Sequence, residues 1–270
     1  MPFASVAGTD VFFGGAEDPA AGLGQVVLLV HGAFDHHDLW RDVVPALARD
    51  HTPVAVDLPG HGRSPGPVLD RAEAYRAFLA GLTDALRLPP FVFCGHSMGG
   101  LLAQLLAAKG LARAIALLTP ARTWGTLPSS EDEIVAAMGL MSTGPFWTQA
   151  MDPVFEIAAE NSLNCLSPKR RGEIFAQFVP ESGQAIFESM FWMFDKNRAS
   201  YVNPLNVDCP VLAIAGGSDK VTSATSVRDV ADKYLEQATY LEFSGMGHML
   251  LLEDNWRAVA DACSEWLETI

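Results

Sequence analysis

The sequence is poor in basic residues and in cysteine. Its 18 lysines and arginines face 32 acidic residues, which leaves a formal net charge of −14 at pH 7. Because this charge repels phosphate backbones and anionic membrane surfaces, nucleic acid is not expected as a partner. The four cysteines are scattered and form no Cys-x-x-Cys pair. We therefore expect idle thiols rather than a zinc site or a redox pair.

Long apolar runs are missing too. Runs such as Val26–Val30 and Ala114–Leu118 are far shorter than the roughly 18 to 20 residues that cross a bilayer. Residues 1–10 lack a basic segment followed by an apolar stretch and a small-residue cleavage site. We expect no membrane span, no secretory signal and a cytoplasmic location, and the sequence leaves the oligomeric state open.

Strand and helix patterns alternate along most of the chain. Short apolar runs rich in Val, Ile and Phe predict buried strands at Val26–Val30, Val54–Val56, Phe91–Cys94, Ala114–Leu118, Val211–Ala215 and Thr239–Phe243. Amphipathic segments predict helices at Asp38–Ala48, Arg71–Leu86, Met98–Lys109, Ser223–Tyr234 and Asn255–Leu267. This order predicts an α/β fold with a mostly parallel sheet between helices. A hairpin of Phe3–Val6 and Val11–Phe13 is expected before it.

Between residues 119 and 206 the alternation stops. Helical stretches broken by prolines replace it, and this part holds 11 of the 25 aromatic residues. It predicts a helical cap at 120–206, inserted between core parts at 1–119 and 207–270. The aromatic side chains are expected to form the core of the cap on one face and an apolar acyl pocket on another. The residues selected for the pocket are Phe34, Phe146, Trp147, Phe191 and Trp192.

Two segments match Gly-x-Ser-x-Gly, the pattern of a serine nucleophile at a strand-to-helix turn. Ser97 follows a predicted strand and precedes a predicted helix, and the N–H of Met98 can bind a developing oxyanion. Ser64 lies in a turn and is followed by Pro65, which has no N–H. The surroundings therefore favour Ser97 and exclude Ser64.

A serine nucleophile requires a base that a carboxylate orients. His248 lies in a glycine-rich loop at the carboxyl edge of the predicted sheet, where ligands bind in open α/β folds. Asp219 follows a strand at the same edge, in the order serine, acid, histidine. Glu253 and Asp254 are expected to begin the last helix instead. The remaining carboxyl groups nearby are disfavoured by their positions: Asp208, Asp229 and Asp232.

The loop after the first predicted core strand is expected to supply the second oxyanion donor. We choose the N–H of Ala33 to act beside that of Met98, with Phe34 as the alternative. His36 and His37 lack metal-ligand spacing with other candidates, so they are expected to be loop residues. The sequence therefore predicts no metal site and no cofactor.

These features together resemble the α/β-hydrolase superfamily over nearly the whole chain. The matching segments, in order, are His31-Gly32, Asp57 to Ser64, Gly95 to Gly100, Asp219 and Gly247-His248. The chain is most similar to the branch with a cap, which includes carboxylesterases, lactonases, carbon–carbon bond hydrolases and cofactor-free haloperoxidases. The resemblance implies a triad of Ser97, Asp219 and His248. A serine at the turn argues against the dehalogenase and epoxide hydrolase relatives, which use aspartate there.

The expected reaction is hydrolysis of a carboxylic ester of a small, largely apolar substrate through an acyl-enzyme. A lactonase or a carbon–carbon bond hydrolase with the same triad is the alternative, and a non-catalytic ligand receptor on this fold is a third hypothesis. A carbon–carbon bond hydrolase often needs polar groups to hold a vinylogous acid. The predicted cap offers few of them: Arg122, Asn161, Asn164 and Arg198.

Overall fold

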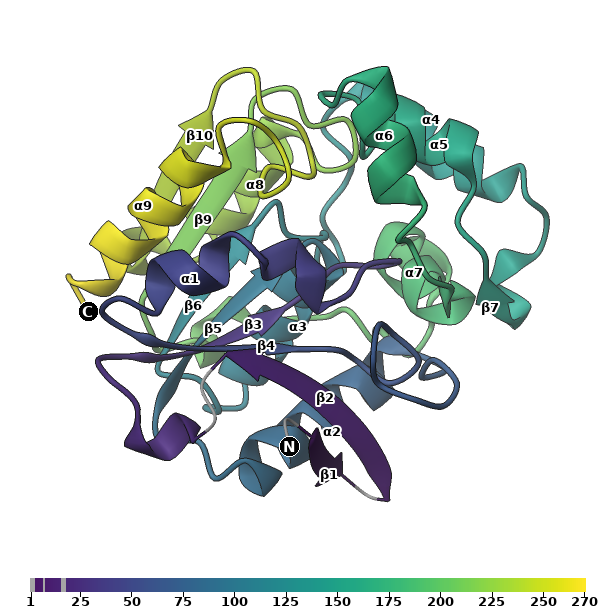
Figure 1. Ribbon diagram of the computed structural model, residues 1–270. Helices are drawn as coiled ribbons and strands as arrows, with labels where there is room; N and C mark the ends of the chain where they lie inside the picture. Colours follow the sequence, from purple (N-terminus) through teal and green to yellow (C-terminus); the bar gives the residue numbers. More distant parts are fainter. Residues whose placement is uncertain (1–2, 7, 16–17) are drawn as a thin grey trace.

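The core of the protein is one twisted sheet, seen in a computed structural model that describes residues 3–6, 8–15 and 18–270 (Figure 1). The eight strands lie in the order β1-β2-β4-β3-β5-β6-β9-β10. From β4 to β10 in this order, neighbouring strands pair in parallel, whereas β2 pairs antiparallel with both β1 and β4. The strands are β1 Phe3–Val6, β2 Thr9–Gly15, β3 Val26–Val30, β4 Thr52–Val56, β5 Phe91–His96, β6 Ala114–Leu118, β9 Val211–Gly216 and β10 Ala238–Phe243. The predicted α/β fold is confirmed.

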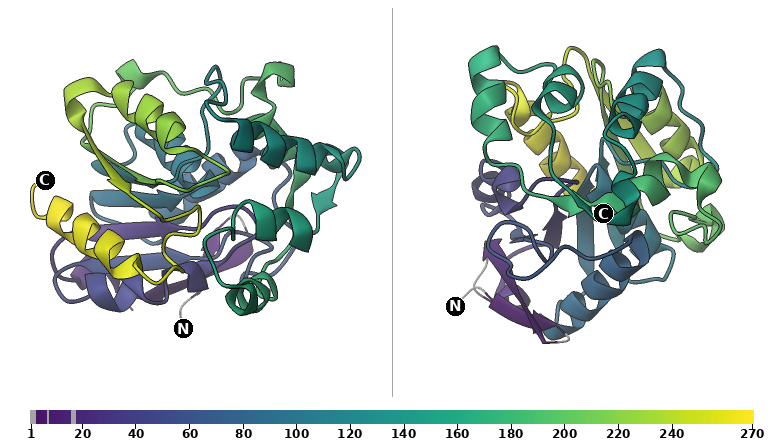
Figure 2. Two further views of the ribbon diagram at one scale, coloured as in Figure 1. Left: turned by 90° about the horizontal axis from the view of Figure 1, so that it is seen from above. Right: turned by 90° about the vertical axis from the view of Figure 1, so that its right-hand side faces the viewer.

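Helices cover both faces of this sheet (Figures 1 and 2). Alternate residues of β3 show the two layers, because Leu28 packs in the core shared with α2 and α3, whereas Leu29 packs in the core shared with α1 and α9. Strands buried on both faces have no need of polar residues, which explains their continuous apolar runs. The helices of these layers are α1 Val43–Leu47, α2 Ala72–Ala85, α3 Met98–Ala107, α8 Ala224–Asp232 and α9 Trp256–Leu267.

The first predicted helix is shorter than expected. The segment predicted as one helix over Asp38–Ala48 is divided into a 3-10 turn at His37–Trp40 and α1. Pro45 accounts for this break, because its ring would clash with the carbonyl of Arg41 in a continuous helix. The helices that the structure describes include none long and apolar enough to cross a membrane. The cytoplasmic location stays a prediction, and residues 1, 2 and 7 of the segment checked for a secretory signal lie outside the described residues.

The cysteines are all free thiols, and Cys94, Cys209 and Cys263 are buried. Burial raises the pKa of each of these three thiols. A thiol that stays protonated is a poor nucleophile and a poor metal ligand. This agrees with the idle thiols expected from the sequence.

The segment between β6 and β9 is helical and lies to one side of the sheet (Figure 1). A short antiparallel pair, β7 Ala150–Met151 with β8 Glu181–Ser182, ties its two halves together. Its helices are α4 Glu131–Met141, α5 Phe155–Glu160, α6 Pro168–Phe175 and α7 Gly183–Met190. The division of the chain at residues 119 and 206 into core and cap stays a prediction.

A buried charge network joins this segment to the core at Glu181. One carboxylate oxygen accepts a hydrogen bond of 2.6 Å from the Tyr75 hydroxyl, and the other lies 3.1 Å from Nε2 of His61. Nδ1 of His61 lies 3.0 Å from the carbonyl of Pro59, so both ring nitrogens face acceptors. Burial disfavours the charged ring, but the Glu181 carboxylate and these hydrogen bonds outweigh it, and the pKa of His61 lies above its ordinary value.

We predict that Glu181→Gln destabilises the protein. Removing one partner of a buried ion pair costs about 3 to 5 kcal/mol, because the other charge stays buried without compensation. Because the pKa of His61 is higher in the folded protein than in the unfolded chain, its charged form stabilises the fold fully at a pH below the unfolded pKa of about 6.5. This stabilisation is lost as the pH rises through the pKa of His61 in the folded protein. The loss should therefore be larger at pH 6 than at pH 9 in urea denaturation. Exposed Glu160→Gln on α5 is the control, and equal unfolding midpoints for the two variants at pH 6 would contradict the prediction.

Candidate active site

Ser97 forms the sharp turn between β5 and α3. Its backbone has φ 50° and ψ −115°, a region that a residue with a side chain rarely adopts. A Cβ on Gly95 would collide with the carbonyl of Gly99, and one on Gly99 would collide with the carbonyl of Val30. The N–H of Ser97 donates to the carbonyl of Leu118 at 3.0 Å, at the end of β6. Glycine at these positions is what allows the turn to pack this closely, as the sequence predicts.

His248 and Asp219 meet beside this turn. Nδ1 of His248 lies 2.8 Å from Oδ2 of Asp219, and both side chains are buried. The other oxygen of Asp219 accepts the N–H groups of Val221 and Thr222 at 2.7 and 3.0 Å, which fixes the carboxylate. A carboxylate on Nδ1 leaves Nε2 of the imidazole as the nitrogen that can accept a proton. Ser97 and His248 line the same cavity.

Three groups that sequence reasoning missed hold the His248 loop. The carbonyl of His248 lies 2.9 Å from Nε2 of His96 and accepts the Thr119 hydroxyl at 3.3 Å. Burial and the neighbouring His248 lower the pKa of His96 to about 3, so this ring stays neutral. The N–H of Gly247 donates to both oxygens of Glu253 at 3.0 Å. These contacts fix the backbone that carries the imidazole, whereas Asp219 contacts the ring itself.

The prediction for Glu253 is wrong. It was expected to begin the last helix, but α9 begins at Trp256, after the cap residue Asn255. Glu253 is buried instead, and its carboxylate points back to the Gly247 N–H. Burial, the largest effect, raises the pKa of this carboxyl above its ordinary value. No pattern in the sequence indicates this contact, because the Glu253 carboxylate accepts a hydrogen bond from a backbone N–H and not from a particular type of side chain.

The two residues chosen as oxyanion donors, Ala33 and Met98, both line the cavity that contains Ser97. Met98 is the first residue of α3, so its N–H has no carbonyl one turn back within the helix. Gly32 lies against the nucleophile, because a Cβ there would come within 2.9 Å of the Ser97 Cβ. The loop after β3 therefore passes the nucleophile. Their roles as donors stay a prediction.

The cavity above Ser97 is small and mainly apolar. It has a volume of about 140 Å³ and lies between the carboxyl ends of the strands and the helices α4, α5 and α7. Its apolar wall includes Ala136, Leu140, Met151, Val154, Ile157, Phe178, Ile186, Met190 and Met249. The polar side chains in the wall, besides Ser97 and the two histidines, are Arg122, Asn161, Ser162, Ser189 and Thr222.

Four of the five pocket residues expected from the sequence are placed elsewhere. Phe34 lines the cavity, but Phe146 and Phe191 do not. They are buried in an apolar cluster that also contains the wall residues Leu140, Met151 and Ile186, and Trp147 packs on this cluster. Trp192 packs against another indole, and its Nε1 donates to the carbonyl of Thr126 at 3.0 Å. A small helical segment has to bury apolar surface of its own, and its large rings do so. Methionines and branched aliphatic side chains line the cavity in their place.

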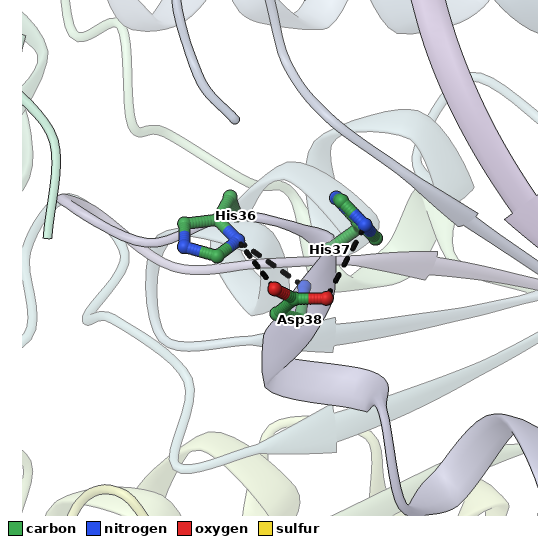
Figure 3. Close-up of side chains that lie close together, drawn as sticks. All are labelled: His36, His37 and Asp38. Atoms are coloured by element: carbon green, nitrogen blue, oxygen red, sulfur yellow. Dashed lines mark hydrogen bonds and ion pairs between the residues drawn. The ribbon is translucent and has the colours of Figure 1, made fainter. Parts of the chain in front are cut away.

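His36, His37 and Asp38 form a cluster that the sequence reasoning did not anticipate (Figure 3). One ligand atom from each lies within 4.8 Å of the others, which corrects the view that these histidines lack suitable neighbours. The ring atoms already have partners, however. Nδ1 of His37 lies 2.8 Å from Oδ2 of Asp57, and Nδ1 of His36 accepts the N–H of Asp38 at 3.3 Å. These bonds order the loop after β3, and none of the three residues lines the cavity.

Comparisons with known proteins identify the family of this chain. The family model described as alpha/beta hydrolase fold matches residues 25–255. An uncharacterised protein of Mycobacterium tuberculosis is 38% identical over 88 residues, 32% of this chain but only 26% of that relative. A pimeloyl-[acyl-carrier protein] methyl ester esterase of Nitrosomonas europaea is 26% identical over 84% of this chain and 90% of its own length. The solved esterase of Exiguobacterium antarcticum superposes with a TM-score of 0.76 at 16% identity, and 98% of each chain is covered.

We predict that Asp219→Asn slows the reaction of Ser97 with a fluorophosphonate probe by a factor on the order of 10³ to 10⁴. The amide cannot stabilise the imidazolium that forms at His248, and it favours the wrong tautomer. Mass spectrometry of the labelled peptide over time measures this rate. Asp232→Asn, an exposed carboxylate on α8, is the matched control and should label at the wild-type rate. Equal labelling of both variants would exclude Asp219 as the partner of His248.

Proposed function

The chain belongs to the alpha/beta hydrolase fold family, and from this we propose that it is a serine hydrolase that cleaves a carboxylic ester of a small, largely apolar substrate. The observation that carries the proposal is the 2.8 Å contact between His248 and Asp219, with Ser97 and His248 in the wall of one cavity. A hydroxyl is a weak nucleophile at neutral pH, and a base held by a carboxylate is what activates it.

In the proposed mechanism Nε2 of His248 removes the proton of Ser97, and Oγ attacks the ester carbonyl. The N–H groups of Met98 and Ala33 bind the oxyanion, supported by the positive end of α3. The imidazolium then protonates the leaving alcohol. His248 next takes a proton from water, which attacks the acyl-enzyme, and it returns this proton to Oγ of Ser97 as the acid is released. Asp219 keeps the ring oriented throughout.

The substrate class follows from the cavity and from residues 120–206, which act as the cap in this proposal. A volume of about 140 Å³ and a mainly apolar wall suit a short, uncharged acyl chain. The same triad would serve a lactonase or a carbon–carbon bond hydrolase. Of the polar groups expected for the latter, Arg122 and Asn161 line the cavity. Asn164 instead donates to the carbonyl of Ser218, and Arg198 packs over the Trp124 ring. The wall therefore favours the ester.

We predict that Ser97→Ala lowers kcat/KM for nitrophenyl butyrate by a factor on the order of 10³ or more, because the residual binding and oxyanion groups alone give little turnover. Ser64→Ala is the matched control, because it changes the other Gly-x-Ser-x-Gly serine. The Ser64 hydroxyl only bridges backbone groups of Phe12 and Asp57, so this variant should lose stability but keep its activity at 25 °C.

The wild-type protein should hydrolyse butyrate and hexanoate esters faster than long-chain esters, because of the small cavity. The series is assayed beside a lactone and a vinylogous acid that a carbon–carbon bond hydrolase would cleave. Turnover of the vinylogous acid without ester hydrolysis would replace the proposed reaction. Near wild-type activity in Ser97→Ala would remove the assigned nucleophile.

A further inference from the structure

We propose that Arg122 is a specificity-determining residue that donates a hydrogen bond to a second, uncharged carbonyl group in the acyl part of the substrate. The preferred substrates are then oxo-acyl esters rather than plain alkanoyl esters. This inference rests on the ester hydrolysis proposed above and names the substrate class of that same site.

A backbone hydrogen bond holds the residue before Arg122 against Ser97. The chain leaves β6, and the N–H of Ala121 donates to the carbonyl of Ser97 at 2.8 Å. The following residue is Arg122, which is only 5% exposed and lines the cavity that contains Ser97 and His248. The side chain of Arg122 is therefore part of the same cavity wall as Ser97.

The charge of Arg122 is balanced by a fixed carboxylate from α4. Nη1 lies 3.2 Å from Oε1 of Glu133, which is fully buried. The two oxygens of Glu133 also accept the N–H groups of Ser223 and Ser129, at 2.8 and 2.6 Å. The guanidinium is therefore anchored on one side by a carboxylate that cannot easily move.

The guanidinium nevertheless keeps an unused donor. Nε of Arg122 is buried and has no hydrogen-bond partner among the described residues. Buried donors are nearly always satisfied, and one left unpaired is costly. A ligand oxygen that pairs with it removes that cost on binding, whereas a methylene group at the same place does not.

Arg122 differs in this from other polar groups of the wall. The Asn161 amide donates to the carbonyl of Ile157 at 2.7 Å, and the Ser189 hydroxyl donates to that of Ile186 at 2.9 Å. The Ser162 hydroxyl donates to the carbonyl of Ala158. Each of these three side chains makes a hydrogen bond within its own segment, whereas Nε of Arg122 has no partner among the described residues.

Charge balance favours a neutral acceptor over a carboxylate. Arg122 and Glu133 together carry no net charge, and Asp219 and Glu253 add acidic groups near the same cavity. A substrate carboxylate would bring an uncompensated negative charge into a largely apolar space. A ketone or second ester carbonyl accepts the same hydrogen bond without that penalty.

The test compares nitrophenyl hexanoate with the 4-oxo and 5-oxo hexanoates, which replace a methylene by a carbonyl at similar size. The nitrophenyl monoester of adipic acid tests the carboxylate. Ser97→Ala supplies the blank rate for each ester. We expect kcat/KM of at least one oxo ester to exceed that of hexanoate about 10-fold to 100-fold, mainly through KM. The adipate monoester should react more slowly than hexanoate.

The variants separate the donor from the ion pair. Arg122→Lys keeps a cation for Glu133 but lacks Nε, and Arg122→Met with Glu133→Gln removes both charges. In each, the ratio of oxo ester to hexanoate should fall to about 1. Arg198→Met removes an exposed arginine outside the cavity and should keep the wild-type ratio.

The possible outcomes separate the proposed role of Arg122 from the proposed ester hydrolysis. A wild-type ratio near 1, a ratio retained in both Arg122 variants, or a preference for the adipate monoester would overturn this inference while leaving ester hydrolysis in place. Absence of turnover for every ester, including hexanoate, would instead contradict the proposed function. The wild-type ratio decides the matter even where a variant does not fold.

Discussion

The close approach of three backbone segments at Ser97 is the constraint on which the site depends. Gly95 and Gly99 let the turn after β5 press against α3 and β3, and Gly32 lets the next loop pass beside the serine. The positive φ of Ser97 is unfavourable by itself. Two backbone hydrogen bonds hold Ser97 in this conformation. Its N–H donates to the carbonyl of Leu118 in β6, and its carbonyl accepts the N–H of Ala121. The packing around this turn thus fixes the position of Ser97, and α3, the loop after β3 and the segment that leads to Arg122 all contact it.

The core and its site could be predicted from the sequence because their signals are local. Strands buried on both faces are continuous apolar runs, and parallel strands bring their carboxyl ends to one edge. Residues just after such runs, including Asp219 and the loop of His248, must therefore lie close together. The choice between the two serines depended on their neighbours: a strand and a helix beside Ser97, and a turn followed by Pro65 at Ser64. The structure gives the other serine a different part, since the hydroxyl of Ser64 donates to the carbonyl of Asp57 and accepts the N–H of Phe12.

The cavity wall could not be predicted in the same way. The helices that face it are short, six residues in α5 and eight in α7, so their periodicity does not show which side faces inward. Composition indicated that aromatic residues gather in this part and form a core there, but not that Phe146 and Phe191 would belong to that core rather than to the cavity wall. Glu253 and Glu181 escaped notice for a related reason. Their partners are a backbone N–H and side chains more than 100 residues away, and neither leaves a pattern in the sequence.

Carboxylates link the segment 120–206 to the rest of the protein, and this explains how a chain of net charge −14 comes to present a donor in its cavity. Glu181 pairs with His61, Glu188 accepts the N–H of Ala72 at 2.9 Å, and Glu133 accepts the N–H of Ser223 while pairing with Arg122. Each acid needs a donor from the opposite side, because a buried carboxylate without one is strongly unfavourable. Ser223 supplies this donor for Glu133, and Arg122, from the same segment as Glu133, adds an ion pair to it and lines the cavity. A guanidinium has five N–H donors, more than one carboxylate uses. The contact with α4 therefore leaves Nε of Arg122 unpaired, and in the proposal above this one side chain gives both structural support and substrate selection.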